Sequence, residues 1–142
     1  DRHRSRRTCR NRRHDDALTA SIASLAEEGL PEIEVAPLSG KRLHLLARMT
    51  GARRVLEIGT LGAYSTIWLA RALPAEGRVV SIEAEPHNAA VARRNLERAG
   101  VAHHVDGLDR TRDVRRDVAH RRELREAFRV ERLCTLLHDV AR

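Results

Sequence analysis

Hydrophobic positions near the start of the chain follow the period of a helix. Leu18, Ile22 and Leu25 stand at i, i+4 and i+7, behind the aspartates at 15–16, either of which can cap a helix. Gly29, with a proline two residues later, is a stop signal. The pattern therefore predicts a helix with one apolar face between the aspartates and Gly29.

A second helix is expected after an irregular segment. Residues 33–38 should be extended or irregular, because Pro37 disfavours helical backbone at the residue before it. Ser39 then begins a helix that ends at Gly51. Glycine is favoured at such a helix end because a β-carbon disfavours the left-handed backbone that terminates the helix. The apolar positions expected to be buried on this helix are Leu43, Leu46 and Ala47.

The next segment alternates between strand and helix patterns. An apolar run over 54–58 precedes a helix pattern over 64–73, and a second β-rich run over 79–83 precedes a helix from His87 to Gly100. Two strands separated by a helix should be parallel with a right-handed crossover. The pattern predicts an α/β fold with its ligand edge at the carboxyl ends of the strands.

The ends of the chain lack these patterns. Residues 1–14 have no apolar periodicity, so we expect a disordered, Arg-rich tail there. After Val101 the segment 102–116 offers no clean strand. We therefore expect an α/β domain over 15–102 and a divergent, possibly helical tail over 103–142.

The positive net charge of the chain is concentrated outside the predicted α/β domain. The formal net charge is +7, but residues 1–14 alone hold seven Arg against one Asp, whereas 15–102 hold ten basic against eleven acidic residues. Of the 27 basic residues only Lys41 is a lysine, which favours a GC-rich coding sequence over selected phosphate contacts. With few aromatics to stack on bases, nucleic acid is an unlikely partner.

Cysteine usage and hydropathy point to a cytoplasmic protein. Cys9 and Cys134 form no motif with zinc spacing. No apolar run is long enough for a signal peptide or a membrane span.

The two strand ends carry the candidate chemistry. Gly59 leaves the first strand end without a side chain, so a ligand can approach the backbone closely. Glu83, at the end of the second strand, can accept hydrogen bonds from ribose hydroxyls, although it could also merely cap the following helix. Glu57 lies in an otherwise apolar strand and could accept from a ligand ammonium group, from backbone N–H groups, or play a purely structural role.

The turn itself narrows the ligand class. A dinucleotide fingerprint needs glycine at three positions to seat a pyrophosphate, and here Leu61 and Tyr64 occupy the second and third. The run 59–62 therefore fits a ligand without phosphates, such as S-adenosylmethionine.

The strings over 55–65 and 81–86 resemble the catechol and caffeoyl-CoA O-methyltransferases, and the resemblance runs from about residue 15 to residue 101. It implies a Rossmann-like parallel sheet of the class I methyltransferase type, truncated here after about two strands. It also implies that S-adenosylmethionine is the cofactor and that magnesium assists the reaction. The cofactor-binding residues that follow from the turn and the resemblance are Val35, Glu57, Gly59, Thr60, Ser65 and Glu83.

Two departures from the family pattern stand out. The family usually has glycine where this chain has Ala63, and a methyl group there could crowd the turn. The family's metal-binding half also has no counterpart, so no metal ligand and no catalytic residue is assigned. The acidic residues that could tempt such an assignment are Asp106, Asp109, Asp113 and Asp117.

The resemblance implies transfer of a methyl group to a hydroxyl of a small, catechol-like acceptor, in a protein that could be a homo-oligomer. Two alternatives stay open: a catalytically inactive cofactor-binding fragment, and an Arg-rich nucleic-acid-binding protein with a methyltransferase-like core. The abrupt loss of resemblance at both ends further predicts ends that are truncated or read out of frame.

Overall fold

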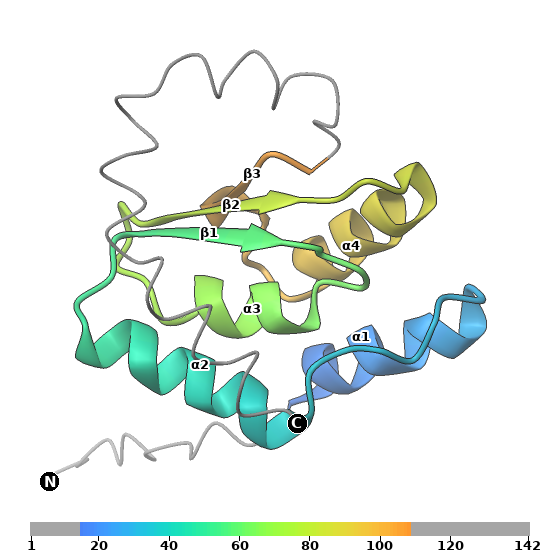
Figure 1. The fold of residues 1–142 in the computed structure, drawn as a ribbon, viewed down its shortest axis with the longest axis horizontal. Helices are drawn as coiled ribbons and strands as arrows, with labels where there is room; N and C mark the ends of the chain where they lie inside the picture. The colour runs from blue at the N-terminus through green and yellow to red at the C-terminus, as the bar shows by residue number, and fades with distance from the viewer. Residues whose placement is uncertain (1–14, 109–142) are drawn as a thin grey trace, which may run out of the picture.

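The computed structural model describes residues 15–108, and Figure 1 shows their arrangement. The expectations for residues 1–14 and for 109–142 lie outside the described residues. The elements in chain order are α1 (Asp16–Glu27), α2 (Pro37–Met49), β1 (Arg54–Ile58), α3 (Tyr64–Ala70), β2 (Arg78–Ile82), α4 (Pro86–Arg98), the 3₁₀ helix η1 (Ala102–His104) and β3 (Val105–Asp106).

The first helix begins as its cap predicts. The Asp15 carboxylate accepts a hydrogen bond from the Leu18 N–H at 3.1 Å and forms an ion pair at 2.7 Å with Arg71, the residue that follows α3. The same side chain therefore caps α1 and ties it to α3.

The second helix begins two residues earlier than Ser39. Ala36 is extended, as expected for a residue before proline, but Pro37 is itself the first helical residue. A proline is favoured there because its missing N–H would have no helical partner and its φ is already helical. The prediction that residues 33–38 are all irregular is thus wrong at its last two positions.

Helix α2 packs on α3, but fewer of its predicted apolar positions are fully buried than expected. Ala47 is buried as predicted, whereas Leu43 and Leu46 are only partly buried, and the other buried positions are Gly40 and His44. The His44 Nδ1 lies 3.0 Å from the Trp68 carbonyl oxygen, and a β-carbon on Gly40 would lie 2.5 Å from Cδ1 of the same tryptophan. Gly40 therefore allows the close approach of the two helices.

The sheet is parallel, as the alternating pattern predicts. Strand β1 pairs with β2, placing Glu57 opposite Ser81, and β2 pairs with β3, placing Val79 opposite Val105. The expectation that no strand follows Val101 is wrong, because β3 adds a third strand to the sheet. A strand of two residues is too short to leave a periodic pattern in the sequence.

The core lies on one face of the sheet. Residues from all four helices and from β2 form one apolar cluster, including Leu18, Ala47, Ile67, Val79 and Leu96. Figure 1 shows α2 and α3 layered beneath β1 on this face. The alternate positions of β1 point the other way, and Ile58 is 82% exposed. Among residues 15–108, no helix is long and apolar enough to cross a membrane.

Candidate functional site

The turn after β1 is shaped by a left-handed glycine. Gly59 has φ +87°, and its N–H donates to the Ile82 carbonyl at 2.8 Å, which holds the turn against the end of β2. A β-carbon on Gly59 would meet no atom within 4 Å, so the backbone conformation, and not crowding, requires glycine. The empty space above it remains open to a ligand.

Ala63 occupies a third left-handed position in the turn, after Gly59 and Leu61. Its φ is +66°, a conformation that costs an alanine about 1–2 kcal/mol. Its methyl group is fully buried in the main core cluster, so burial offsets part of that cost. Alanine in place of the family's glycine thus has a conformational cost that burial of its methyl group partly offsets.

Glu83 follows β2 and holds the turn in place. Its Oε2 accepts hydrogen bonds from the N–H groups of Thr60 at 3.1 Å and Leu61 at 2.8 Å, and its Oε1 accepts from Glu85 N–H at 3.0 Å. Burial opposes ionisation of this carboxyl, which is only 7% exposed, but the backbone donors outweigh burial and hold its pKa below the usual range. Glu83 is thus a fixed negative charge at the carboxyl edge of the sheet.

Glu57 has a different environment. Its Oε1 accepts from the Ser65 hydroxyl at 2.6 Å, and its Oε2 accepts from the hydroxyls of Thr66 at 2.5 Å and Ser81 at 2.6 Å. Burial raises the pKa of Glu57, and the three hydroxyl donors lower it by less than burial raises it. The donors are side-chain hydroxyls, not the backbone N–H groups of the turn that the sequence suggested.

Thr60 links the two glutamates. Its N–H donates to Glu83, and its Oγ1 lies 2.6 Å from the Ser81 Oγ. Ser81 has one hydroxyl proton and gives it to Glu57, so Thr60 donates to Ser81. A continuous hydrogen-bonded chain therefore runs from Glu83 through Thr60 and Ser81 to Glu57.

A cavity of about 290 Å³ opens above this turn. Five of the six predicted cofactor-binding residues line it: Val35, Gly59, Thr60, Ser65 and Glu83. Glu57 does not line it and lies behind Ser65. Lining residues that the sequence did not single out for this site include Glu34, Tyr64 and Asn88. Glu34 stands beside Val35 in a loop without periodicity, so only its position next to a predicted residue could have indicated it.

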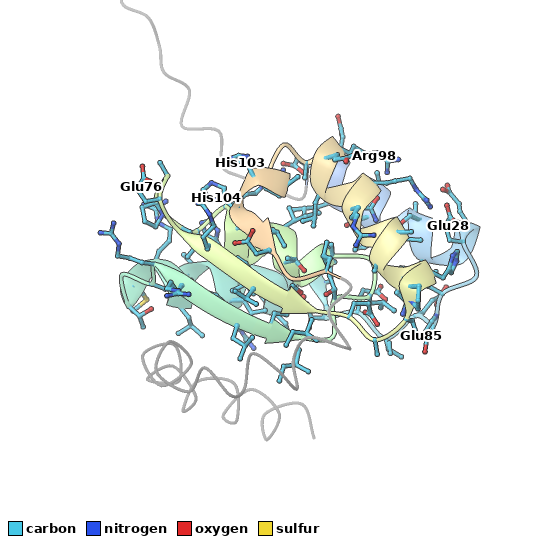
Figure 2. All side chains as sticks on the ribbon, turned by 90° about the horizontal axis from the view of Figure 1, so that it is seen from above. Glu28, Glu76, Glu85, Arg98, His103 and His104 are labelled. Atoms are coloured by element: carbon cyan, nitrogen blue, oxygen red, sulfur yellow. The ribbon has the colours of Figure 1, made fainter. Side chains whose placement is uncertain are left out.

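The opposite end of the sheet carries a histidine pair that does not belong to this site. The rings of His103 and His104 lie 4.2 Å apart, and the Nδ1 of His104 lies 2.9 Å from the Gly77 carbonyl oxygen. Figure 2 shows both histidines and Glu76 at one end of the sheet and Glu85, at the start of α4, at the other.

Magnesium, which the resemblance implies, needs a set of oxygen ligands. Within residues 15–108 no group of three or more His, Cys, Asp or Glu could hold a metal ion. Asp106 is exposed on β3, whereas Asp109, Asp113 and Asp117 lie outside the described residues. The described residues therefore do not fit a magnesium site.

Comparison with known proteins identifies the family. A profile of the O-methyltransferase family matches residues 13–118, which extends past Val101, where the resemblance in the sequence ends. This chain belongs to the O-methyltransferase family. A catechol O-methyltransferase of Niastella koreensis is 54% identical over 91 residues, which are 64% of this chain and 41% of that protein. One from Mycobacterium tuberculosis is 55% identical over 92 residues, which are 65% of this chain and 42% of that protein.

Solved structures of O-methyltransferases share the fold. TomG of Streptomyces achromogenes, in complex with S-adenosylmethionine, superposes with a TM-score of 0.64 at 52% identity, over 67% of this chain and 43% of that one. A Bacillus cereus O-methyltransferase in complex with S-adenosylhomocysteine superposes with a TM-score of 0.64 at 48% identity, over 66% of this chain and 42% of that one. The fold is the Rossmann-like α/β fold of class I methyltransferases, and this O-methyltransferase chain spans less than half the length of these relatives.

Proposed function

We propose that this chain forms the S-adenosylmethionine-binding part of an enzyme that methylates a hydroxyl of a small, catechol-like acceptor. The transfer moves the methyl group from the sulfonium sulfur to the acceptor oxygen and releases S-adenosylhomocysteine and the hydroxyl proton. The observation that carries the proposal is the pairing of Gly59 and Glu83 at one cavity. An open backbone and a fixed carboxylate stand there side by side.

Each residue of this cavity has a place in the proposal. Glu83 is ionised and immobilised, so it accepts hydrogen bonds from the ribose hydroxyls. Gly59 leaves room for the ligand beside the backbone. Val35 and Ser65 line the cavity, and the proposal assigns them to the methionine end of the cofactor. Glu57 acts from behind the wall by fixing the Ser65 hydroxyl.

A cofactor-binding unit that does not itself complete the reaction is the second candidate. Two observations favour it: the chain covers 41% of the catechol O-methyltransferase from Niastella koreensis, and residues 15–108 contain no cluster of metal ligands. Both candidates require the same cofactor site, and they differ in whether further residues complete an enzyme around that site.

Calorimetric titration with S-adenosylmethionine tests the site. We expect saturable binding by the full chain and a loss of about 1–3 kcal/mol in binding free energy for Glu83→Ala, the value of a charge-assisted hydrogen bond. Glu85→Ala is the matched control, because this neighbouring side chain is exposed. A folded chain that gives no heat at millimolar ligand would overturn the proposal.

A further inference from the structure

Glu34 brings a second carboxylate to the wall of the cavity. It lies in the loop between α1 and α2, beside Val35, and lines the cavity together with Tyr64 and Ser65. Its Oε2 is buried, and among residues 15–108 this atom has no hydrogen-bond partner. A buried carboxylate oxygen without a donor is costly, so a donor supplied from the cavity would stabilise it.

The charge of Glu34 acts on Tyr64, another residue that lines the cavity. Burial raises the pKa of Tyr64, and the negative charge of Glu34 raises it further. Tyr64 is the first residue of α3 and stands next to Ser65. The Glu34 carboxylate is therefore close to Tyr64, whose neighbour Ser65 is proposed to bind the methionine end of the cofactor.

Glu57 is the other carboxylate near this end, and its place behind Ser65 makes it a poor direct partner for a ligand. Both of its oxygens accept hydroxyl protons, from Ser65 on one side and from Thr66 and Ser81 on the other. It also does not line the cavity. Of Glu34 and Glu57, only Glu34 is therefore available to a cationic group in the cavity.

We propose that Glu34 binds the ammonium group at the methionine end of the cofactor. The assignment rests on the proposed function, since it presumes that S-adenosylmethionine occupies the cavity. An ammonium group supplies the donors that the buried Oε2 lacks and neutralises its charge. Glu57 then serves as a positioning residue that orients Ser65, while Glu34 makes the contact.

Two ligands that differ only at this end test the assignment. S-adenosylhomocysteine carries the amino-acid group, whereas 5′-methylthioadenosine retains the adenosine and the sulfur and lacks it. The full chain and its variants Glu34→Gln, Glu57→Gln and Glu32→Gln are titrated with both ligands by calorimetry. Glu32 is an exposed glutamate in the same loop and serves as the control. Thermal melts check that each variant is folded.

The expected result is selective. Glu34→Gln weakens S-adenosylhomocysteine roughly tenfold or more, the effect of one charge-assisted hydrogen bond, and leaves 5′-methylthioadenosine unchanged. Undiminished binding of S-adenosylhomocysteine by Glu34→Gln, or an equal loss for both ligands, overturns the assignment. A selective loss in Glu57→Gln instead of Glu34→Gln overturns it in favour of Glu57. If the unmutated chain binds neither ligand, the proposed function itself has failed.

Discussion

Ser81 lies directly opposite Glu57 in the paired strands and donates its hydroxyl proton to Glu57 Oε2 at 2.6 Å. This contact joins β1 to β2 beneath the cofactor turn, and Thr60 extends it to Glu83. The two glutamates are thus parts of one network, but they sit in opposite electrostatic environments: one accepts from hydroxyls and the other from backbone N–H groups.

The Glu57→Gln variant should gain stability relative to the unmutated chain as pH rises. The pKa of Glu57 in the folded chain is raised above its ordinary value of 4.5, so its contribution to stability is full below 4.5 and is lost as pH rises through the raised value. Glutamine does not ionise, so its contribution does not fall as pH rises. A hydroxyl that now donates to Glu57 can rotate and accept a hydrogen bond from the glutamine amide group. Urea unfolding of both proteins across pH 5–8 measures the difference in free energy of unfolding. If the difference in free energy of unfolding does not change with pH, the pKa of Glu57 is not raised by burial and the prediction is wrong.

Glu83→Gln should behave in the opposite way. The pKa of Glu83 is lowered, so its stabilising contribution is present above 4.5 and is lost as pH falls through the lowered value. An amide has one oxygen, and its NH₂ group must face at least one of the backbone donors of Thr60, Leu61 and Glu85. We expect a loss of about 1–3 kcal/mol in unfolding free energy at pH 7. Glu85→Gln, unfolded in parallel, should match the unmutated chain.

Gly40→Ala should destabilise the chain by overpacking. The new β-carbon would lie 2.5 Å from Cδ1 and 2.6 Å from Nε1 of Trp68, so α2 and α3 must separate, at a cost of about 1–3 kcal/mol. Ser39→Ala, at the preceding helical position, should have a much smaller effect. Tryptophan fluorescence during urea unfolding follows both variants, because Trp68 is the one tryptophan of the chain. Equal midpoints for the two variants would contradict the close packing.

The chain alone should not methylate catechols at saturating S-adenosylmethionine and magnesium. Its described residues contain no cluster of metal ligands, and it spans 41% of the catechol O-methyltransferase from Niastella koreensis. Transfer of a labelled methyl group, with the same mixture lacking protein as control, measures turnover. Product above that background would show that residues outside 15–108 complete the site.

Local signals in the sequence predicted the elements that depend on neighbouring residues. Asp15 caps α1 through a residue three positions away, and the apolar runs of β1 and β2 mark their own strands. Features that depend on distant contacts were not visible. Strand β3 exists because Val105 pairs with Val79, and the partners of Glu57 include Ser81, which only the strand register brings opposite.

The same distinction applies to the site. Gly59 and Glu83 were predictable because a strand end and a turn mark them in the sequence, and both line the cavity. Glu34 was missed because its loop has no period, and the burial of its Oε2 and its proximity to Tyr64 depend on tertiary contacts.

The central claim is that S-adenosylmethionine-type ligands bind at the turn between β1 and α3. Nitrogen-15 NMR of the full chain during titration with S-adenosylhomocysteine tests it most directly. We predict saturable shifts of the backbone amides of Gly59, Thr60 and Ser65, with little change at His103 and His104 at the far end of the sheet. A folded chain whose turn amides do not move, or whose shifts gather at the histidine pair, would contradict the account.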